Sequence, residues 1–150
     1  MKPLDSKDIA ILEALQRNGR MSLSELGRQI GLSQPSVSER VARLESDGII
    51  CGYSARLNLH KLGLKLSAVI RLATVHDHIA TCLKRFAGMP NIIEVTRVTG
   101  QDCFILKAVF ADPGELEQLI DSIAQYGPVQ TAVVLRAESP KVIGRELLSH

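Results

Sequence analysis

Apolar residues recur at helical spacing in three short runs near the start of the chain. The first run predicts a helix over residues 5–17 with Asp5 as its N-cap. The second predicts a short helix that starts at Ser22 and closes at Gly31, and the third a helix that begins after Ser33. The apolar positions are Ile9, Leu12 and Leu15 in the first run, Leu23, Leu26 and Ile30 in the second, and Val37, Val41 and Leu44 in the third.

A proline lies near the front of the third run, within "GLSQPSVSERVARLE". If Ser33 is the N-cap, Pro35 is the second helical residue, where a missing N–H breaks no intrahelical hydrogen bond. The proline is therefore compatible with the start of a helix.

Two short helices joined by "GLS" and preceded by a third form the pattern of a helix-turn-helix, whose second helix enters the major groove of DNA. We place this domain at residues 1–50. A turn at Asp47-Gly48 and the β-prone segment after it suit a small wing or a connecting strand, and we place a linker at residues 51–64.

Polar side chains of the third helix are the candidate DNA contacts. Hydroxyl and amide groups can bind base edges or phosphates, Arg40 could reach a guanine or a phosphate, and Arg43 a phosphate. The full candidate set is Ser33, Gln34, Ser36, Ser38, Arg40 and Arg43. The same pattern also fits a solvated face on a small helical bundle. Glu39 could accept from a cytosine amine or pair with Arg43, and we favour the pairing.

The second half alternates strand and helix patterns in the order βαββαβ, the ferredoxin-like split unit. The expected strands are 66–75, 92–98, 103–111 and 129–137, and the expected helices are 77–89 and the segment capped by Asp112. This predicts an α+β domain over residues 65–150, with both helices on one face of an antiparallel sheet. A second copy would cover the other face, so we expect a homodimer.

The turn Thr99-Gly100-Gln101-Asp102 joins two of these strands. Its carboxylate and bare backbone amides could hold the ammonium and carboxylate of an amino acid. The alternative is a plain hairpin in which Gly100 supplies a positive φ and Asp102 bonds local backbone.

Composition narrows the function classes. The net charge of +2 argues neither for nor against nucleic acid, and the absence of Trp makes base stacking on single strands a poor main function. No apolar run is long enough for a membrane span and the start of the chain is charged, so we expect a cytoplasmic protein. Three scattered cysteines indicate structural, reduced thiols.

Enzyme chemistry has no candidate nucleophile, base or phosphate-binding loop in this sequence, because none of the usual motifs occurs. His76-Asp77-His78 suggests a metal site, but we interpret it as a solvated turn. We therefore expect that the protein is not an enzyme and that it binds no metal and no cofactor.

The N-terminal run "LDSKDIAILEALQRNGRMSLSELGRQIGLSQPSVSERVARLESDGIICGYSARLNLHKLGL" resembles the DNA-binding half of the leucine-responsive and asparagine-responsive (Lrp/AsnC, feast/famine) bacterial regulators. "IIEVTRVTGQDCFILKAVF" resembles the hairpin of their amino-acid-metabolism regulatory (RAM) domain. The resemblance implies a winged helix-turn-helix transcriptional regulator that binds double-stranded DNA. It also implies a homodimer, commonly assembled into tetramers or octamers, with an amino-acid effector bound between regulatory domains.

By position, the resemblance places Thr99, Gly100, Gln101 and Asp102 on the effector turn. Many members have Asp three residues after the Gly, whereas here Asp102 follows Gly100 by two, which leaves the effector open. Two other functions also stay open: a weakly specific architectural DNA-binding protein, and a metabolite-binding allosteric module on the ferredoxin-like half.

Overall fold

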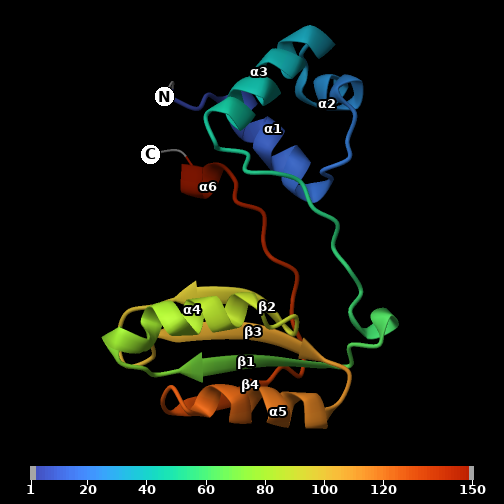
Figure 1. The fold of residues 1–150 in the computed structure, drawn as a ribbon. Coiled ribbons are helices and arrows are strands. Elements are labelled where there is room, and N and C mark those ends of the chain that lie inside the picture. Colours follow the sequence, from blue (N-terminus) through green and yellow to red (C-terminus); the bar gives the residue numbers. More distant parts are fainter. Residues whose placement is uncertain (1–2, 149–150) are drawn as a thin grey trace. The chain divides into compact units, whose positions relative to one another are not determined.

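The computed structural model describes residues 3–148 and divides into two compact units. The helical unit contains the chain up to Arg56 together with the segment from Ser139, and the sheet unit is Leu57–Glu138 (Figure 1). The sheet unit ends at Glu138, whereas the expected C-terminal domain runs to residue 150. Residues 139–148 leave the sheet unit and return to the first helix.

Three helices form the body of the helical unit: α1 (Ser6–Arg17), α2 (Leu23–Ile30) and α3 (Gln34–Ser46). Each begins at the expected N-cap, because the side chains of Asp5, Ser22 and Ser33 accept backbone N–H groups of the first turn that have no helical partner. Pro35 lies in the first turn of α3, as predicted. Gly31 ends α2 in the left-handed conformation, with φ of 70°.

The turn between α2 and α3 depends on a close backbone approach. A Cβ atom on Gly27 would lie 2.6 Å from the carbonyl oxygen of Leu32, so only glycine fits there without a shift. This close approach, with the Leu32 N–H donating to the Gly27 carbonyl at 2.9 Å, packs the turn against α2. The core shared by the three helices contains Ile11, Ala14, Leu26, Ile30, Val37, Val41 and Leu44.

The predicted wing does not form. Residues 47–58, all of them described by the structure, contain no strand. The N–H groups of Ile49 and Ile50 instead bond the carbonyl of Leu44 at 2.9 and 3.0 Å, which folds the chain back onto the end of α3. Ladder hydrogen bonds are thereby replaced by a helix C-terminal motif.

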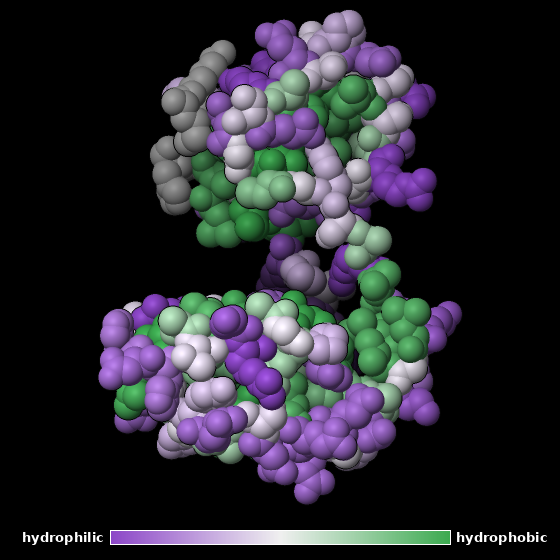
Figure 2. Space-filling model, in the orientation of Figure 1, coloured by the Kyte–Doolittle hydropathy of each residue, from purple (hydrophilic) through white to green (hydrophobic). Residues whose placement is uncertain are grey.

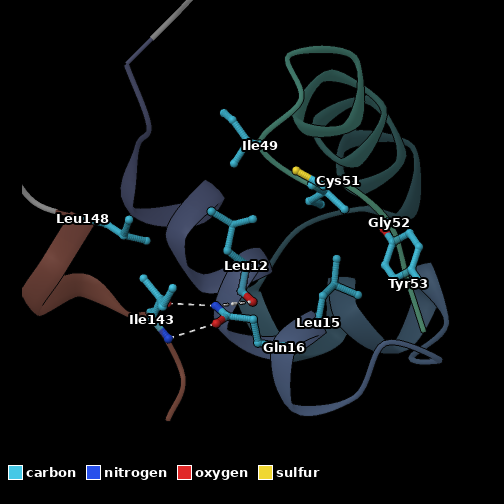
Figure 3. A pocket seen from close by; sticks show the side chains of 10 residues that line it. Leu12, Leu15, Gln16, Ile49, Cys51, Gly52, Tyr53, Ile143 and Leu148 are labelled. Carbon is cyan, nitrogen blue, oxygen red and sulfur yellow. Dashed lines mark hydrogen bonds between the residues drawn. The ribbon is translucent and has the colours of Figure 1, made fainter. Parts of the chain in front are cut away.

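The C-terminal segment packs on α1 in the same unit (Figure 3). The Gln16 side-chain amide donates to the carbonyl of Ile143 and its oxygen accepts the Ile143 N–H, both at 2.9 Å. Glu13 accepts the N–H of Arg145 at 3.1 Å, at the start of α6 (Arg145–Leu148). Leu12 and Leu15, expected in the main core, are only half-buried and line a cavity of about 380 Å³ beside this segment.

The sheet unit has the expected ferredoxin-like order. Strands β1 (Leu66–Leu72), β2 (Ile92–Arg97), β3 (Phe104–Phe110) and β4 (Val129–Val133) form one antiparallel sheet in the order β2-β3-β1-β4. The helices are α4 (Ile79–Ala87) and α5 (Pro113–Ala124), with short 3₁₀ turns at His60–Leu62 and His76–His78. The first and last strands end three and four residues earlier than predicted, at Leu72 and Val133, and the two middle strands end one residue earlier.

Both helices cover one face of the sheet, as predicted. Phe86 of α4 and Ile123 of α5 share a buried core with alternate residues of the central strands, such as Ile70 and Leu106. The opposite face of the central strands carries Val69, Arg71, Ile105 and Lys107, which are half-buried or exposed. We call this surface the open face.

Candidate nucleic-acid interface and effector turn

The sides of α3 divide into stripes with different partners. Val37, Val41 and Leu44 lie in the core, as predicted. Gln34 and Ser38 are exposed on an outer side, and Glu39 is exposed as well. Figure 2 shows mainly hydrophilic side chains around the end of the helical unit where α2 and the start of α3 lie in Figure 1. This exposed part of α3 is the candidate nucleic-acid interface.

Two serines define the N-terminal end of this interface. The hydroxyls of Ser33 and Ser36 lie 2.9 Å apart and share a hydrogen bond, and Ser33 Oγ also accepts the N–H of Ser36 at 3.4 Å. Each hydroxyl keeps capacity for another partner, because a hydroxyl both donates and accepts. The first-turn amides beside them carry the positive end of the helix dipole, which favours an anion such as a phosphate.

The two arginines expected at the DNA surface point to α1 instead. Arg40 Nη1 donates to Asp5 Oδ2 and to Asp8 Oδ1, each at 2.7 Å, and Arg43 Nη2 lies 2.6 Å from Asp8 Oδ1. The predicted pairing of Arg43 with Glu39 is wrong. Arg43 lies on the side of α3 that faces α1, where its partner is Asp8. We call Asp5, Asp8, Arg40 and Arg43 the charge network.

Burial differs sharply between the two carboxylates of the network. The Asp8 side chain is 1% exposed, whereas that of Asp5 is 45% exposed. Asp8 also accepts the N–H of Asp5 at 3.1 Å, which completes a reciprocal capping box at the start of α1. Asp8 is thus a buried anchor, and Asp5 is its solvent-exposed neighbour.

The network lowers the pKa of both carboxyls. For Asp5, the backbone N–H of Asp8 and the Arg40 guanidinium lower the pKa to about 2. For Asp8, burial alone raises the pKa, but the Arg43 guanidinium, the N–H of Asp5 and Arg40 outweigh it, and the net pKa is below the ordinary value. Both groups are therefore carboxylates at neutral pH, and the four charges cancel.

Sequence reasoning missed the roles of Asp5 and Asp8 beyond the helix cap. Their spacing of three residues matches the spacing of Arg40 and Arg43, which places each pair on one side of its helix. Two complementary charge pairs at equal spacing are a signal that could have indicated the contact between α1 and α3.

The predicted effector turn lies between β2 and β3. Thr99, Gly100 and Gln101 are exposed, and Gly100 has φ of 105°, which explains the glycine. Asp102 is half-buried and its carboxylate lies 3.6 Å from Arg71 on the open face. The Arg71 guanidinium also donates to the side chain of Gln130 on β4. The turn therefore brings a carboxylate and a guanidinium together at one end of the open face.

The remaining candidate groups show structural roles. The three cysteines, all within the described residues, are free thiols, and Cys103 donates to the carbonyl of Thr74 at 2.9 Å. Burial raises the pKa of the Cys82 thiol. Among residues 3–148 we find neither a cluster of ligating side chains that could hold a metal nor a helix long and apolar enough to span a bilayer.

The sequence matches two family models. Residues 4–45 match the AsnC-type helix-turn-helix domain, and residues 67–142 match the Lrp/AsnC ligand binding domain. The HTH-type transcriptional regulator YezC of Bacillus subtilis is 38% identical over 140 residues, which cover 91% of this chain and 96% of YezC.

Solved structures agree over nearly the whole chain. LrpC of B. subtilis superposes with a TM-score of 0.87 at 35% identity, covering 94% of this chain and all of LrpC. A transcriptional regulator of Neisseria meningitidis, solved as its L-Met complex, superposes with a TM-score of 0.86 at 27% identity, covering 93% and 96%.

A helix-turn-helix unit joined to a ferredoxin-like unit defines a transcriptional regulator with a ligand-binding domain, not an enzyme. Both domain matches occur in the expected order and together span most of the chain. The chain belongs to the Lrp/AsnC family of transcriptional regulators.

Proposed function

We propose that the protein is a cytoplasmic, sequence-specific regulator that binds double-stranded DNA through the exposed side of α3. The single observation that carries this is a capped helix whose apolar residues are buried and whose polar residues Gln34 and Ser38 are exposed, with Ser36 half-buried beside them. The side chains proposed to meet the DNA are Ser33, Gln34, Ser36 and Ser38. Gln34 suits bidentate recognition of adenine, and the serines suit base edges or phosphates.

A homodimer formed through the open faces of two sheets would present two such helices. Val69 and Ile105 give this face apolar contact area, and a cover over them stabilises the sheet. Recognition helices related by a dyad read half-sites about 34–36 Å apart, so the operator should be roughly palindromic. Further assembly into tetramers or octamers is the family expectation.

Selection from a randomised duplex library, followed by footprinting, tests this function. A palindromic consensus protected at two successive major grooves is the expected result. Protection without a preferred sequence in competitor DNA would indicate an architectural protein instead. Sedimentation of the free protein would show a dimer or a multiple of it.

We further propose that the effector is an α-amino acid bound at Thr99, Gly100, Gln101 and Asp102. The Asp102 carboxylate can accept hydrogen bonds from the ammonium group, while Arg71 and the backbone amides of the turn can donate to the carboxylate of the amino acid. The L-Met complex of the N. meningitidis regulator supports this class of ligand. Binding alters DNA affinity only if one assembly state binds the amino acid better than another.

Calorimetry of the operator complex against each of the twenty amino acids tests the effector. Heat from one or a few of them, lost in Asp102→Asn, is expected. The absence of heat from all of them would reject an amino-acid effector. Binding heat that is unchanged in Asp102→Asn would show that the amino acid does not bind at this turn.

A further inference from the structure

The cationic side chains of the recognition helix are occupied within the protein. Over residues 34–46, all described by the structure, the charged residues are Glu39, Arg40, Arg43 and Glu45. Both arginines lie on carboxylates of α1 at 2.6–2.7 Å, so α3 offers DNA two exposed carboxylates and no available cation among these residues. Hydroxyl and amide groups are left as the contact chemistry.

Each carboxylate of the network has a distinct place. Asp8, 1% exposed, lies 2.7 Å from Arg40 and 2.6 Å from Arg43, so Asp8 and Asp5 share Arg40 between them. Asp5, 45% exposed, holds Arg40 from the solvent side, and Arg40 itself remains 28% exposed. Ser36, Glu39 and the two arginines line a shallow polar cavity of about 280 Å³ next to this contact. A phosphate at this cavity would compete with Asp5 for the same guanidinium.

Arginine–phosphate contacts strengthen binding to any duplex, because they release counterions whatever the sequence. Base-edge contacts by neutral side chains strengthen binding only to the right sequence. A carboxylate that keeps an arginine away from phosphates therefore lowers non-specific affinity more than specific affinity.

We propose that Asp5 is a specificity-determining residue: it retains Arg40 on α1 and so suppresses sequence-independent binding of the recognition helix to phosphates. Asp8 and Arg43 are positioning residues that keep α3 docked on α1 in the same orientation. The proposal rests on the proposed function, because it assumes that α3 meets DNA.

Asp5→Asn is the sharpest perturbation, because asparagine caps a helix as well as aspartate does. The oxygen that accepts the cap N–H groups is kept, while the charge and the acceptor oxygen that faces Arg40 are lost. Asp47→Asn is its matched control: it removes an exposed carboxylate at the other end of α3 and changes the net charge equally. Arg40→Gln and the double variant Asp5→Asn/Arg40→Gln complete a cycle that shows whether any effect passes through Arg40.

Fluorescence anisotropy measures the affinity of each variant for two labelled duplexes between about 50 and 200 mM salt. One duplex has a scrambled sequence, and the other is the sequence selected by the protein. For the scrambled duplex we expect Asp5→Asn to bind severalfold tighter, with a salt slope steeper by about 0.9, the value of one added phosphate contact. Asp47→Asn should change the salt slope less than Asp5→Asn does, and Arg40→Gln should keep the wild-type slope. The double variant Asp5→Asn/Arg40→Gln should also show the wild-type slope.

The opposite pattern would overturn the proposal. A slope that is shallower by about 0.9 in Arg40→Gln means that Arg40 already contacts a phosphate in the wild-type complex. A steeper slope that persists in the double variant, whose net charge equals that of the wild type, means that the effect of Asp5 does not pass through Arg40. Wild-type protein that binds neither duplex rejects the proposed function itself, which separates that failure from failure of the role of Asp5.

Discussion

Replacing Asp8 by asparagine should destabilise the helical unit while leaving the sheet unit intact. Asp8 is the only buried charged side chain among the described residues, and it binds Arg40, Arg43 and the N–H of Asp5. Asparagine keeps the volume and one acceptor oxygen, but it removes the charge and turns an amide toward two guanidinium groups. The helix cap can persist, so the loss comes mainly from the charge network.

The size of the effect follows from burial. Removing one partner of a buried ion pair costs about 3–5 kcal/mol. Both arginines are 28% exposed and Arg40 keeps Asp5, so water and the remaining carboxylate offset part of this. We expect a loss of about 2–3 kcal/mol, which lowers the melting temperature of so small a unit by on the order of 10–20 °C.

Differential scanning calorimetry of the full chain measures this, with amide hydrogen exchange assigning each transition to its unit. Asp121→Asn, an exposed carboxylate on α5, is the control and should leave both transitions within about 0.5 kcal/mol of wild type. A change of less than about 0.5 kcal/mol in Asp8→Asn would refute the reasoning, because the network would then contribute nothing to the docking of α3.

Three further outcomes follow from the same geometry. The pKa of Asp5 is about 2 in the folded chain and about 3.9 when unfolded, so the stabilisation by Asp5 is complete above about pH 4 and is lost as pH falls through about 2. The pKa of Asp8 is also lowered, so the stabilisation by Asp8 is likewise lost on acidification below its unfolded pKa. Melting temperatures of wild type and Asp5→Asn should converge at about pH 2. Gly27→Ala should destabilise the helical unit by about 1–3 kcal/mol, whereas Gly88→Ala, whose new Cβ meets only an ordinary contact at 3.6 Å, should not; equal effects on urea unfolding would contradict this. Gln16→Ala removes two hydrogen bonds to Ile143 and should cost about 1–2 kcal/mol, seen as faster exchange of the Ile143 amide; unchanged protection there would show that the segment is held by other contacts.

Local chemistry made the helical caps and the sheet topology predictable. The caps at Asp5, Ser22 and Ser33 depend on the residue itself and on backbone a few positions away, so sequence spacing defines them. Strand order followed from the alternation of strand and helix patterns, because few topologies satisfy a βαββαβ order.

Long-range pairing made the site harder to predict. Arg40 has the sequence context of a DNA contact, and its partners lie 35 and 32 residues earlier in the chain. A pattern of polar positions shows which side chains leave the core, but not which of them meet another helix at its edge. The predicted wing does not form because of a local contact instead. The N–H groups of the β-prone residues 49 and 50 bond back to the carbonyl of Leu44, and this motif replaces a strand.

The C-terminal segment has a consequence for how the helical unit forms. The three helices α1, α2 and α3 are complete after Ser46. Leu12 and Leu15 of α1, however, are covered on one side only once Ile143 is in place, 127 residues after its partner Gln16. Contacts at such separation form after local ones, because the intervening loop must first be closed. A fragment that ends at Arg56 would therefore keep the charge network and the interface of α3, but would expose the apolar side of α1 that the segment covers. The exposed side of α3 and the segment that packs on α1 thus lie far apart in the sequence, and removal of residues 139–148 should lower the stability of the helical unit without removing a residue of the candidate interface.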